Sequence, residues 1–222
     1  MNLEGLKINF LGDSITQGLR TKNKEAIYPA VLKREANLKE ARNYGISGTR
    51  FALQKGTPER PKDDYEDVNS FCERFDQMDD DADVVIVFGG TNDYGHGDAR
   101  LGGFSDRTPD TFYGACHYLF RGLIKKYLGK TIVIMTPLHR LEETRNNGTQ
   151  KTEGYGTLRE YVNIIREVAE YYSLPVLDLY AISGLQPEID EIREKYIPDG
   201  LHPNENGHAV IAHKLKRFLE AL

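Results

Sequence analysis

Residues 9–18 read "NFLGDSITQG", and this stretch decides how the chain is expected to fold. An apolar run that includes Phe10 and Leu11 is followed at once by small residues, among which Gly12 and Gly18 allow a sharp change of direction. A short apolar run that ends in such a turn is typical of a strand that leads into a helix. The pattern therefore predicts a strand whose carboxyl end displays Ser14.

Similar β-rich runs recur along the chain, with helical patterns between them. The runs are "KINFLG" (7–12), "EARNYGISG" (40–48), "DVVIVFGG" (83–90), "TIVIMTP" (131–137) and "PVLDLYAI" (175–182). The spacing of apolar residues predicts helices near residues 28–36, 69–78, 109–128, 155–172 and 204–222. Strands that alternate with helices are typical of a parallel sheet covered on both faces, so we expect one three-layer α/β/α domain over residues 1–222.

Composition limits the class of partner and the compartment. The formal net charge is −5 and no dense cluster of Lys and Arg occurs, which argues against a nucleic-acid partner. The longest apolar run, 84–88, is far shorter than the roughly 20 residues of a membrane-spanning helix, so we expect no membrane partner. The first six residues lack an extended apolar segment, and the only cysteines, Cys72 and Cys116, fall in predicted helices. We therefore expect a cytoplasmic protein with two reduced thiols.

Four short blocks of small and polar residues stand out. They are "GDS" (12–14), "GISG" (45–48), "GGTND" (89–93) and "DGLHP" (199–203). Each block alone has an ordinary interpretation as a helix cap, a turn or a loop. The first three follow predicted strands, however, and the carboxyl ends of parallel strands lie side by side at one edge of the sheet. We therefore expect the blocks to meet, together with the last one, which precedes the C-terminal helix.

The first and last blocks contain the residue types of nucleophilic catalysis. A serine hydroxyl such as that of Ser14 is a poor nucleophile until a base removes its proton, and a neutral imidazole is the usual base. His202 is the candidate base. Asp199 lies three residues earlier, close enough for one turn to place its carboxylate against the ring and fix the tautomer.

The two middle blocks contain candidate hydrogen-bond donors for an oxyanion hole. A tetrahedral intermediate of acyl transfer needs donors aimed at its oxygen anion. The backbone N–H groups of Ser14 and Gly48 and the side-chain amide of Asn92 are three such donors. Gly45 is the alternative glycine of the second block.

Together the four blocks resemble those of the SGNH hydrolase superfamily, also called the GDSL esterase/lipase family. The resemblance runs in order and spacing from Ile8 to the C-terminus. It implies a flavodoxin-like fold around about five parallel strands. It also implies that Asp13 orders the nucleophile turn and that Ser14 is the nucleophile. Gly48 and Asn92 would then be oxyanion donors, Asp199 the acid and His202 the base.

Two stretches are too long for simple connections. Residues 48–67 and 93–110 each follow a strand end, so we expect them to form walls of a ligand site. Tyr94, His96 and Phe104 in the second stretch are candidates for an aromatic wall against a sugar or acyl group. The alternative is that they pack beneath their own loop.

Three candidate substrate contacts complete the predicted site: Asp13, Tyr94 and His96. His96 and Asp98 of the second long stretch, with His139 elsewhere, do not form a recognised metal-ligand spacing. We therefore predict no metal and no cofactor.

The sequence thus predicts a carboxylic ester hydrolase that works through an acyl-enzyme on Ser14. A mean hydropathy of −0.55, the absence of tryptophan and the lack of an apolar lid helix favour a short acyl group, such as acetyl on a carbohydrate. The expected partner is a small ester, and a homo-oligomer is left open. The alternatives are a lipase or thioesterase for longer acyl chains, and a non-catalytic flavodoxin-like domain for carbohydrate binding or signalling.

Overall fold

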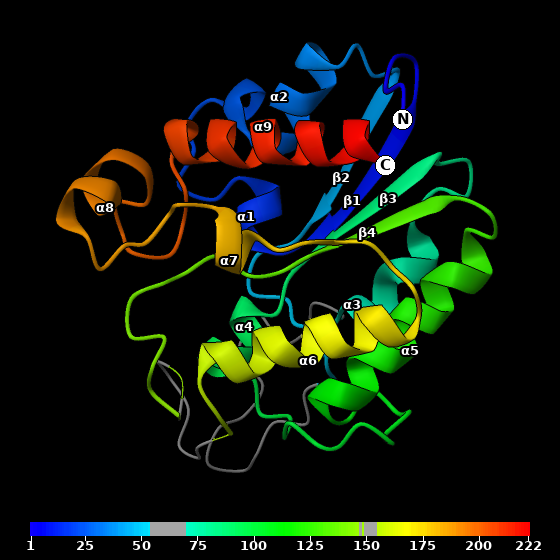
Figure 1. Cartoon of the computed structure of the whole chain (residues 1–222), viewed down its shortest axis with the longest axis vertical. Helices are drawn as coiled ribbons and strands as arrows, with labels where there is room; N and C mark the ends of the chain where they lie inside the picture. The colour runs from blue at the N-terminus through cyan, green and yellow to red at the C-terminus, as the bar shows by residue number, and fades with distance from the viewer. Residues whose placement is uncertain (54–69, 147, 149–154) are drawn as a thin grey trace.

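The structure, a computed structural model, describes residues 1–53, 70–146, 148 and 155–222. Within these ranges five parallel strands form one sheet in the order β2-β1-β3-β4-β5 (Figure 1). The strands are β1 (Lys7–Gly12), β2 (Glu40–Gly45), β3 (Val84–Phe88), β4 (Thr131–Met135) and β5 (Val176–Leu177). The predicted α/β fold with a five-stranded parallel sheet is confirmed.

One face of the sheet is covered by α2 (Tyr28–Glu35) and α9 (Glu205–Ala221), which lie next to each other in Figure 1. Their buried side chains, such as Leu32 and Leu215, pack with sheet residues such as Ile86. The apolar residues of α9 recur every three or four positions, which places them on one stripe that faces the sheet.

The opposite face is covered by α3 (Phe71–Arg74), α5 (Phe112–Lys126) and α6 (Leu158–Tyr171) (Figure 1). Aromatic rings join these helices. The centroids of Phe112 and Tyr161 lie 4.7 Å apart in an edge-to-face contact. Cys72 and Cys116 are buried in this layer, and neither forms a disulfide within the described residues.

The last strand is shorter than the apolar run 175–182 predicts. β5 ends at Leu177, and Asp178 caps a short helix, α7 (Leu179–Ile182), by accepting a hydrogen bond from the Ala181 N–H. The Asp178 carboxylate also accepts a hydrogen bond of 2.9 Å from the Thr136 hydroxyl. These bonds turn the backbone out of the sheet, so the second half of the run is helical.

Other short helices connect the main elements. They are α1 (Ser14–Gln17), η1 (Lys24–Ala26), η2 (Phe75–Gln77), α4 (Thr91–His96) and α8 (Asp190–Tyr196). Of these, α1 and α4 begin directly after β1 and β3, so they start at the same edge of the sheet. The carboxyl ends of β1, β2, β3 and β4 are in register at this edge, because Gly12 pairs with both Gly45 and Phe88, and Phe88 pairs with Met135.

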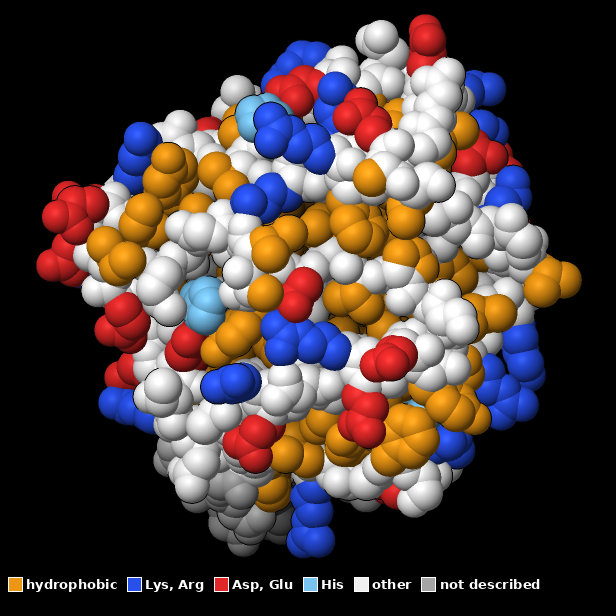
Figure 2. Space-filling model, viewed as in Figure 1, with side chains coloured by type: hydrophobic (Ala, Val, Ile, Leu, Met, Phe, Trp, Pro, Cys, Tyr) orange, Lys and Arg blue, Asp and Glu red, His pale blue; other side chains and the backbone are white. Residues whose placement is uncertain are grey.

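The surface mixes charges of both signs. Figure 2 shows Lys and Arg side chains interspersed with Asp and Glu, and hydrophobic side chains that gather in a band over the region between α9 and α6. Among the helices of the described residues, none combines the length and the apolar character that a bilayer crossing requires.

Candidate active site

The first block forms a tight turn between β1 and α1. Asp13 is the N-cap of α1, and its side chain accepts a hydrogen bond of 3.0 Å from the Ile15 N–H. A Cβ atom at Gly12 would lie 1.8 Å from the Thr16 hydroxyl, so only glycine fits where β1 meets α1. Ser14 therefore lies at the first position of the helix, where its N–H group has no intrahelical partner.

The last block brings an imidazole to this serine. The Nε2 atom of His202 lies 3.0 Å from the Oγ atom of Ser14. The Nδ1 atom of the same ring lies 2.8 Å from Oδ2 of Asp199. The three side chains therefore form one continuous chain of hydrogen bonds. In this arrangement Nδ1–H donates to the carboxylate, which leaves Nε2 free to accept the serine proton.

Backbone contacts hold the loop that carries the imidazole. The Asp199 carboxylate accepts hydrogen bonds from the N–H groups of Leu201 (3.0 Å) and His202 (2.7 Å). The Leu141 N–H donates to the Gly200 carbonyl at 2.9 Å, which ties this loop to the segment after β4. The aspartate thus orients the histidine through its side chain and through its backbone.

The electrostatics of this loop keep Asp199 ionised. Burial opposes ionisation, but the hydrogen bonds from the His202 ring and from the His202 and Leu201 N–H groups lower the pKa of Asp199 to about 2. Arg20 lies on the outer side, with Nε 3.6 Å from Oδ2 of Asp199. A carboxylate that stays negative at neutral pH stabilises an imidazolium beside it.

The second block provides a backbone N–H group at Gly48. Gly48 has a φ of +77°, which favours glycine, and its N–H donates no hydrogen bond to another described residue. The alternative, Gly45, differs in this respect because its N–H donates to Oδ1 of Asn43 at 2.8 Å. Of these two glycines, only Gly48 has an N–H group without an acceptor among the described residues.

The third block places an amide on α4. Gly90 is the N-cap of this helix, and Asn92 follows in its first turn. Nδ2 of Asn92 donates a hydrogen bond of 3.0 Å to the Thr49 carbonyl, which leaves one N–H of the amide for another acceptor. The carboxylate of Asp93 accepts from the N–H groups of Phe51 (2.9 Å) and Ala52 (3.0 Å). These hydrogen bonds join α4 to the loop that follows the "GISG" block.

The chain matches a known protein family. Residues 10–210 match the GDSL-like lipase/acylhydrolase family. The chain belongs to this family. The solved structure of a protein from Lactobacillus plantarum is 30% identical, with a TM-score of 0.81 over 98% of each chain. No curated protein matches the sequence.

Two further solved structures show the same fold. The lipase/acylhydrolase from Enterococcus faecalis is 20% identical, with a TM-score of 0.64, and the match covers 97% of this chain and 96% of that one. A two-domain esterase active on acetylated mannans is also 20% identical, with a TM-score of 0.62. That match covers 98% of this chain and 49% of the esterase.

Two of the three expected substrate contacts of this GDSL-like acylhydrolase are buried. Asp13 is 1% exposed and forms the cap described above. Tyr94 is fully buried, packs against Tyr161 and donates its hydroxyl proton to the Glu142 carbonyl. Both side chains are therefore almost entirely closed to solvent. Tyr94 is buried because residues 91–96 form a helix, and this helix directs the ring into the core.

The other two expected wall residues have different surroundings. His96 is half-buried, and its Nδ1 accepts a hydrogen bond of 2.8 Å from the guanidinium of Arg50. Phe104 packs with His117 and Tyr171, which places it beside α5 and α6. Most of the first long stretch, 48–67, lies outside the described residues.

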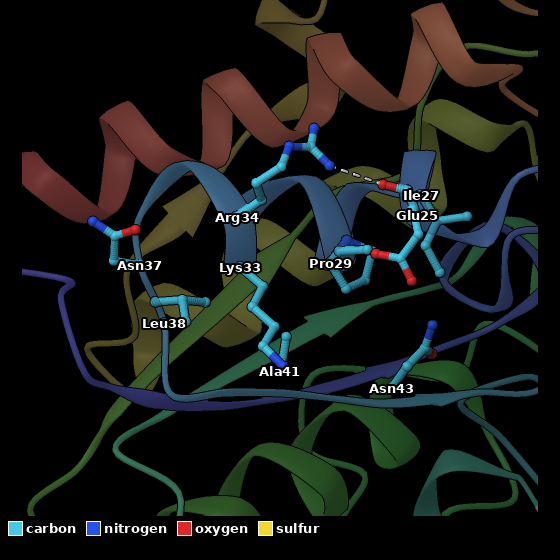
Figure 3. A pocket seen from close by; sticks show the side chains of 10 residues that line it. Glu25, Ile27, Pro29, Lys33, Arg34, Asn37, Leu38, Ala41 and Asn43 are labelled. Atoms are coloured by element: carbon cyan, nitrogen blue, oxygen red, sulfur yellow. Dashed lines mark hydrogen bonds between the residues drawn. The ribbon is translucent and has the colours of Figure 1, made fainter.

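A large hollow lies away from the catalytic candidates. It has a volume of about 740 Å³ and lies between α2 and the edge strand β2, where Lys33, Ala41 and Asn43 line it (Figure 3). None of the predicted site residues lines this hollow. Within the described ranges, no cluster of three or more His, Cys, Asp or Glu side chains is arranged to hold a metal ion.

Sequence reasoning missed two residues at the site. Thr49 accepts the Asn92 amide through its carbonyl, and Arg74 donates to the Thr49 hydroxyl at 3.1 Å. A threonine after a glycine block and an arginine in a distant helix carry no motif. The groups that accept these hydrogen bonds are a backbone carbonyl and a hydroxyl, and neither contact can be recognised in the sequence.

Proposed function

We propose that the protein is a carboxylic ester hydrolase that forms an acyl-enzyme on Ser14. The observation that carries this proposal is the hydrogen-bonded chain from Ser14 Oγ through the His202 ring to the Asp199 carboxylate. Family membership supports ester hydrolysis in general, because the family comprises lipases and acylhydrolases.

The first half of the reaction builds the acyl-enzyme. Ser14 Oγ attacks the ester carbonyl carbon while Nε2 of His202 takes the hydroxyl proton, and the carbonyl π electrons move onto oxygen. Asp199 stabilises the resulting imidazolium. When the tetrahedral intermediate collapses, the carbon–oxygen bond to the alcohol breaks, and the imidazolium gives its proton to the departing alkoxide.

The second half releases the acid. Water attacks the acyl carbon of the Ser14 ester, and His202 takes one proton from that water. Collapse of the second tetrahedral intermediate breaks the bond to Ser14 Oγ, which regains a proton from the imidazolium. The products are a carboxylic acid and the original enzyme.

The oxygen anion of each intermediate requires hydrogen-bond donors. We assign this role to the N–H groups of Ser14 and Gly48 and to the side-chain amide of Asn92. Each donor of an oxyanion hole contributes roughly 3 kcal/mol to transition-state stabilisation. The left-handed conformation of Gly48 and the hydrogen bond that holds Asn92 support this assignment.

For the substrate we propose a short acyl ester, with acetyl groups on a carbohydrate as the leading class. A mean hydropathy of −0.55 and the absence of tryptophan favour a hydrophilic ester over a lipid. An esterase active on acetylated mannans has a similar fold, and this likeness in fold supports the same class of substrate.

Hydrolysis of an ester panel tests the proposal. The panel contains 4-nitrophenyl acetate, butyrate and octanoate, together with acetylated xylo- and manno-oligosaccharides. We expect turnover that falls with acyl length and disappears in Ser14→Ala. The matched control is Ser105→Ala, which removes a hydroxyl from an exposed loop position. Full turnover by Ser14→Ala would exclude this nucleophile, and a preference for octanoate would favour a lipase.

A further inference from the structure

We propose that Arg74 is the positioning residue of the oxyanion hole, because one guanidinium ties together the segments that carry all three donors. This inference rests on the proposed ester hydrolysis and adds a residue to its machinery. Arg74 is the last residue of α3, lies outside the four blocks, and is 5% exposed.

The guanidinium of Arg74 binds three oxygens from different parts of the chain. Nη2 donates to the Gly12 carbonyl at 2.6 Å and to the Thr49 hydroxyl at 3.1 Å. Nη1 donates to the Tyr44 carbonyl at 2.6 Å. The acceptors lie at the end of β1, near the end of β2 and in the loop that follows β2.

Each acceptor lies next to a proposed donor. Gly12 precedes Ser14 by two residues, so its carbonyl fixes the strand end from which the nucleophile turn departs. Thr49 follows Gly48 directly, and its own hydroxyl donates to the Ile46 carbonyl at 2.7 Å. This bond spans Gly48, so the guanidinium holds the loop on both sides of that N–H group.

The third donor is reached through Thr49. Its carbonyl accepts the Asn92 amide, while its hydroxyl accepts Arg74. The chain of contacts therefore runs from Arg74 through Thr49 to Asn92. A shift of the guanidinium would change the spacing of the three donors, and an oxyanion hole depends on that spacing.

Arginine suits this position because its rigid, planar fork reaches several acceptors at fixed angles, which lysine cannot do with one nitrogen. Burying this cation is costly, and no carboxylate lies within 4.0 Å of it among the described residues. Burial lowers the pKa of Arg74 to about 10, against the attraction of Asp13, so the guanidinium remains charged at neutral pH. A fixed positive charge close to the segments that carry the donors also favours an oxygen anion held by them.

The test is the separation of kcat from KM in Arg74→Gln and Arg74→Lys, with 4-nitrophenyl acetate as substrate. We expect kcat to fall by about tenfold to a hundredfold in both variants. This loss is smaller than the loss of kcat expected when a whole oxyanion donor is removed. KM is expected to stay within about threefold, because the ground-state ester makes little use of the hole. The control is Arg42→Gln, which removes from β2 a guanidinium that pairs with Glu40, Asp79 and Asp81.

Binding of an alkyl boronic acid gives a readout that a purely structural role would not change. Its tetrahedral adduct on Ser14 places an oxygen in the hole, so its inhibition constant should rise in proportion to the loss of kcat. Proportional changes support the positioning role. Wild-type kcat and boronate affinity in Arg74→Gln, or full recovery in Arg74→Lys, would overturn it.

A second pair of variants keeps the test open if Arg74→Gln does not fold. Thr49→Val removes the hydroxyl that accepts Arg74 and leaves the guanidinium in place, whereas Thr49→Ser retains the hydroxyl. We expect about a tenfold loss of kcat in the valine variant and near wild-type kcat in the serine variant. Equal activity of the two variants would contradict the link through Thr49. An inactive wild-type enzyme would instead contradict ester hydrolysis itself.

Discussion

Oγ of Ser14 and Nε2 of His202 lie 3.0 Å apart although 188 positions separate them in the sequence. Two packing relationships bring them together. Ser14 is fixed by the end of β1, which lies between β2 and β3 in the sheet, whereas His202 lies in the loop before α9, the helix that packs on α2. The contact between hydroxyl and imidazole is therefore a property of the completed sheet and of its covering helices.

Asp199→Asn should reduce kcat by about 10⁴-fold at neutral pH. An asparagine keeps an oxygen for the N–H groups of Leu201 and His202 but loses the negative charge that orients and stabilises the imidazole. Steady-state hydrolysis of 4-nitrophenyl acetate measures the effect. Asp190→Asn, on an exposed position of α8, serves as control. A loss of less than about tenfold would show that Asp199 is not the acid partner.

Gly48→Ala should lower both stability and kcat. A Cβ atom at a φ of +77° costs about 1–2 kcal/mol of unfolding free energy, and the strain moves the N–H group that we assign to the oxyanion hole. Gly184→Ala is a matched control because Gly184 has a φ of +73° and open space around it, away from the site. Urea unfolding should show similar losses, while kcat falls only for Gly48→Ala. Equal kcat in the two variants would argue against the Gly48 donor.

Asp13→Asn should stabilise the protein increasingly as the pH rises from 4 to 7. Burial raises the pKa of Asp13 to about 6, against the Ile15 N–H and the attraction of His202 and Arg74. The folded state therefore binds a proton that the unfolded state has lost, and the carboxylate destabilises the fold by up to about 3 kcal/mol above pH 6. Asparagine retains the cap without this charge. Urea unfolding of both proteins across this range checks the prediction, and a difference independent of pH would contradict it.

His208→Gln should flatten the loss of stability at acid pH. Burial lowers the pKa of His208 to about 4, and its Nδ1 accepts a hydrogen bond from the Tyr28 N–H. Between about pH 6.5 and 4 the unfolded state binds the proton and the folded state does not. Stability thus falls as the pH falls, by up to about 3 kcal/mol.

The control for this prediction is His213→Gln on the same helix. The His213 side chain is exposed and contacts Glu35, so its variant should follow the wild-type dependence on pH. Urea midpoints at pH 7, 5.5 and 4.5 provide the comparison. Parallel curves for wild type and His208→Gln would contradict the assignment of the acid-sensitive step to His208.

Sequence patterns predict the sheet and the residues that gather at its edge because both follow from short-range rules. Runs such as residues 84–88 are apolar throughout, as a strand buried on both faces requires. The end of β5 could not be predicted in this way, because Asp178 interrupts an apolar run through contacts with distant Thr136 and Arg166. The burial of Tyr94 likewise depends on a short helix whose start at Gly90 has no polar side-chain cap.

Arg74 illustrates the same limit within the site. Its three acceptors come from residues 12, 44 and 49, and two of them are backbone carbonyls that every residue type has. No spacing rule connects an arginine in α3 with those positions. Only the folded backbone shows that one side chain reaches all of them.

The order of the catalytic candidates along the chain also has a consequence for biosynthesis. A nascent chain that has left the ribosome as far as β4 already contains Ser14, Gly48 and Asn92, but it lacks His202, the proposed base that removes the hydroxyl proton. On the proposed mechanism, ester cleavage begins only after the loop before α9 has emerged and docked. The onset of turnover would therefore report that this loop has docked, and chains in which it has not docked would not cleave esters.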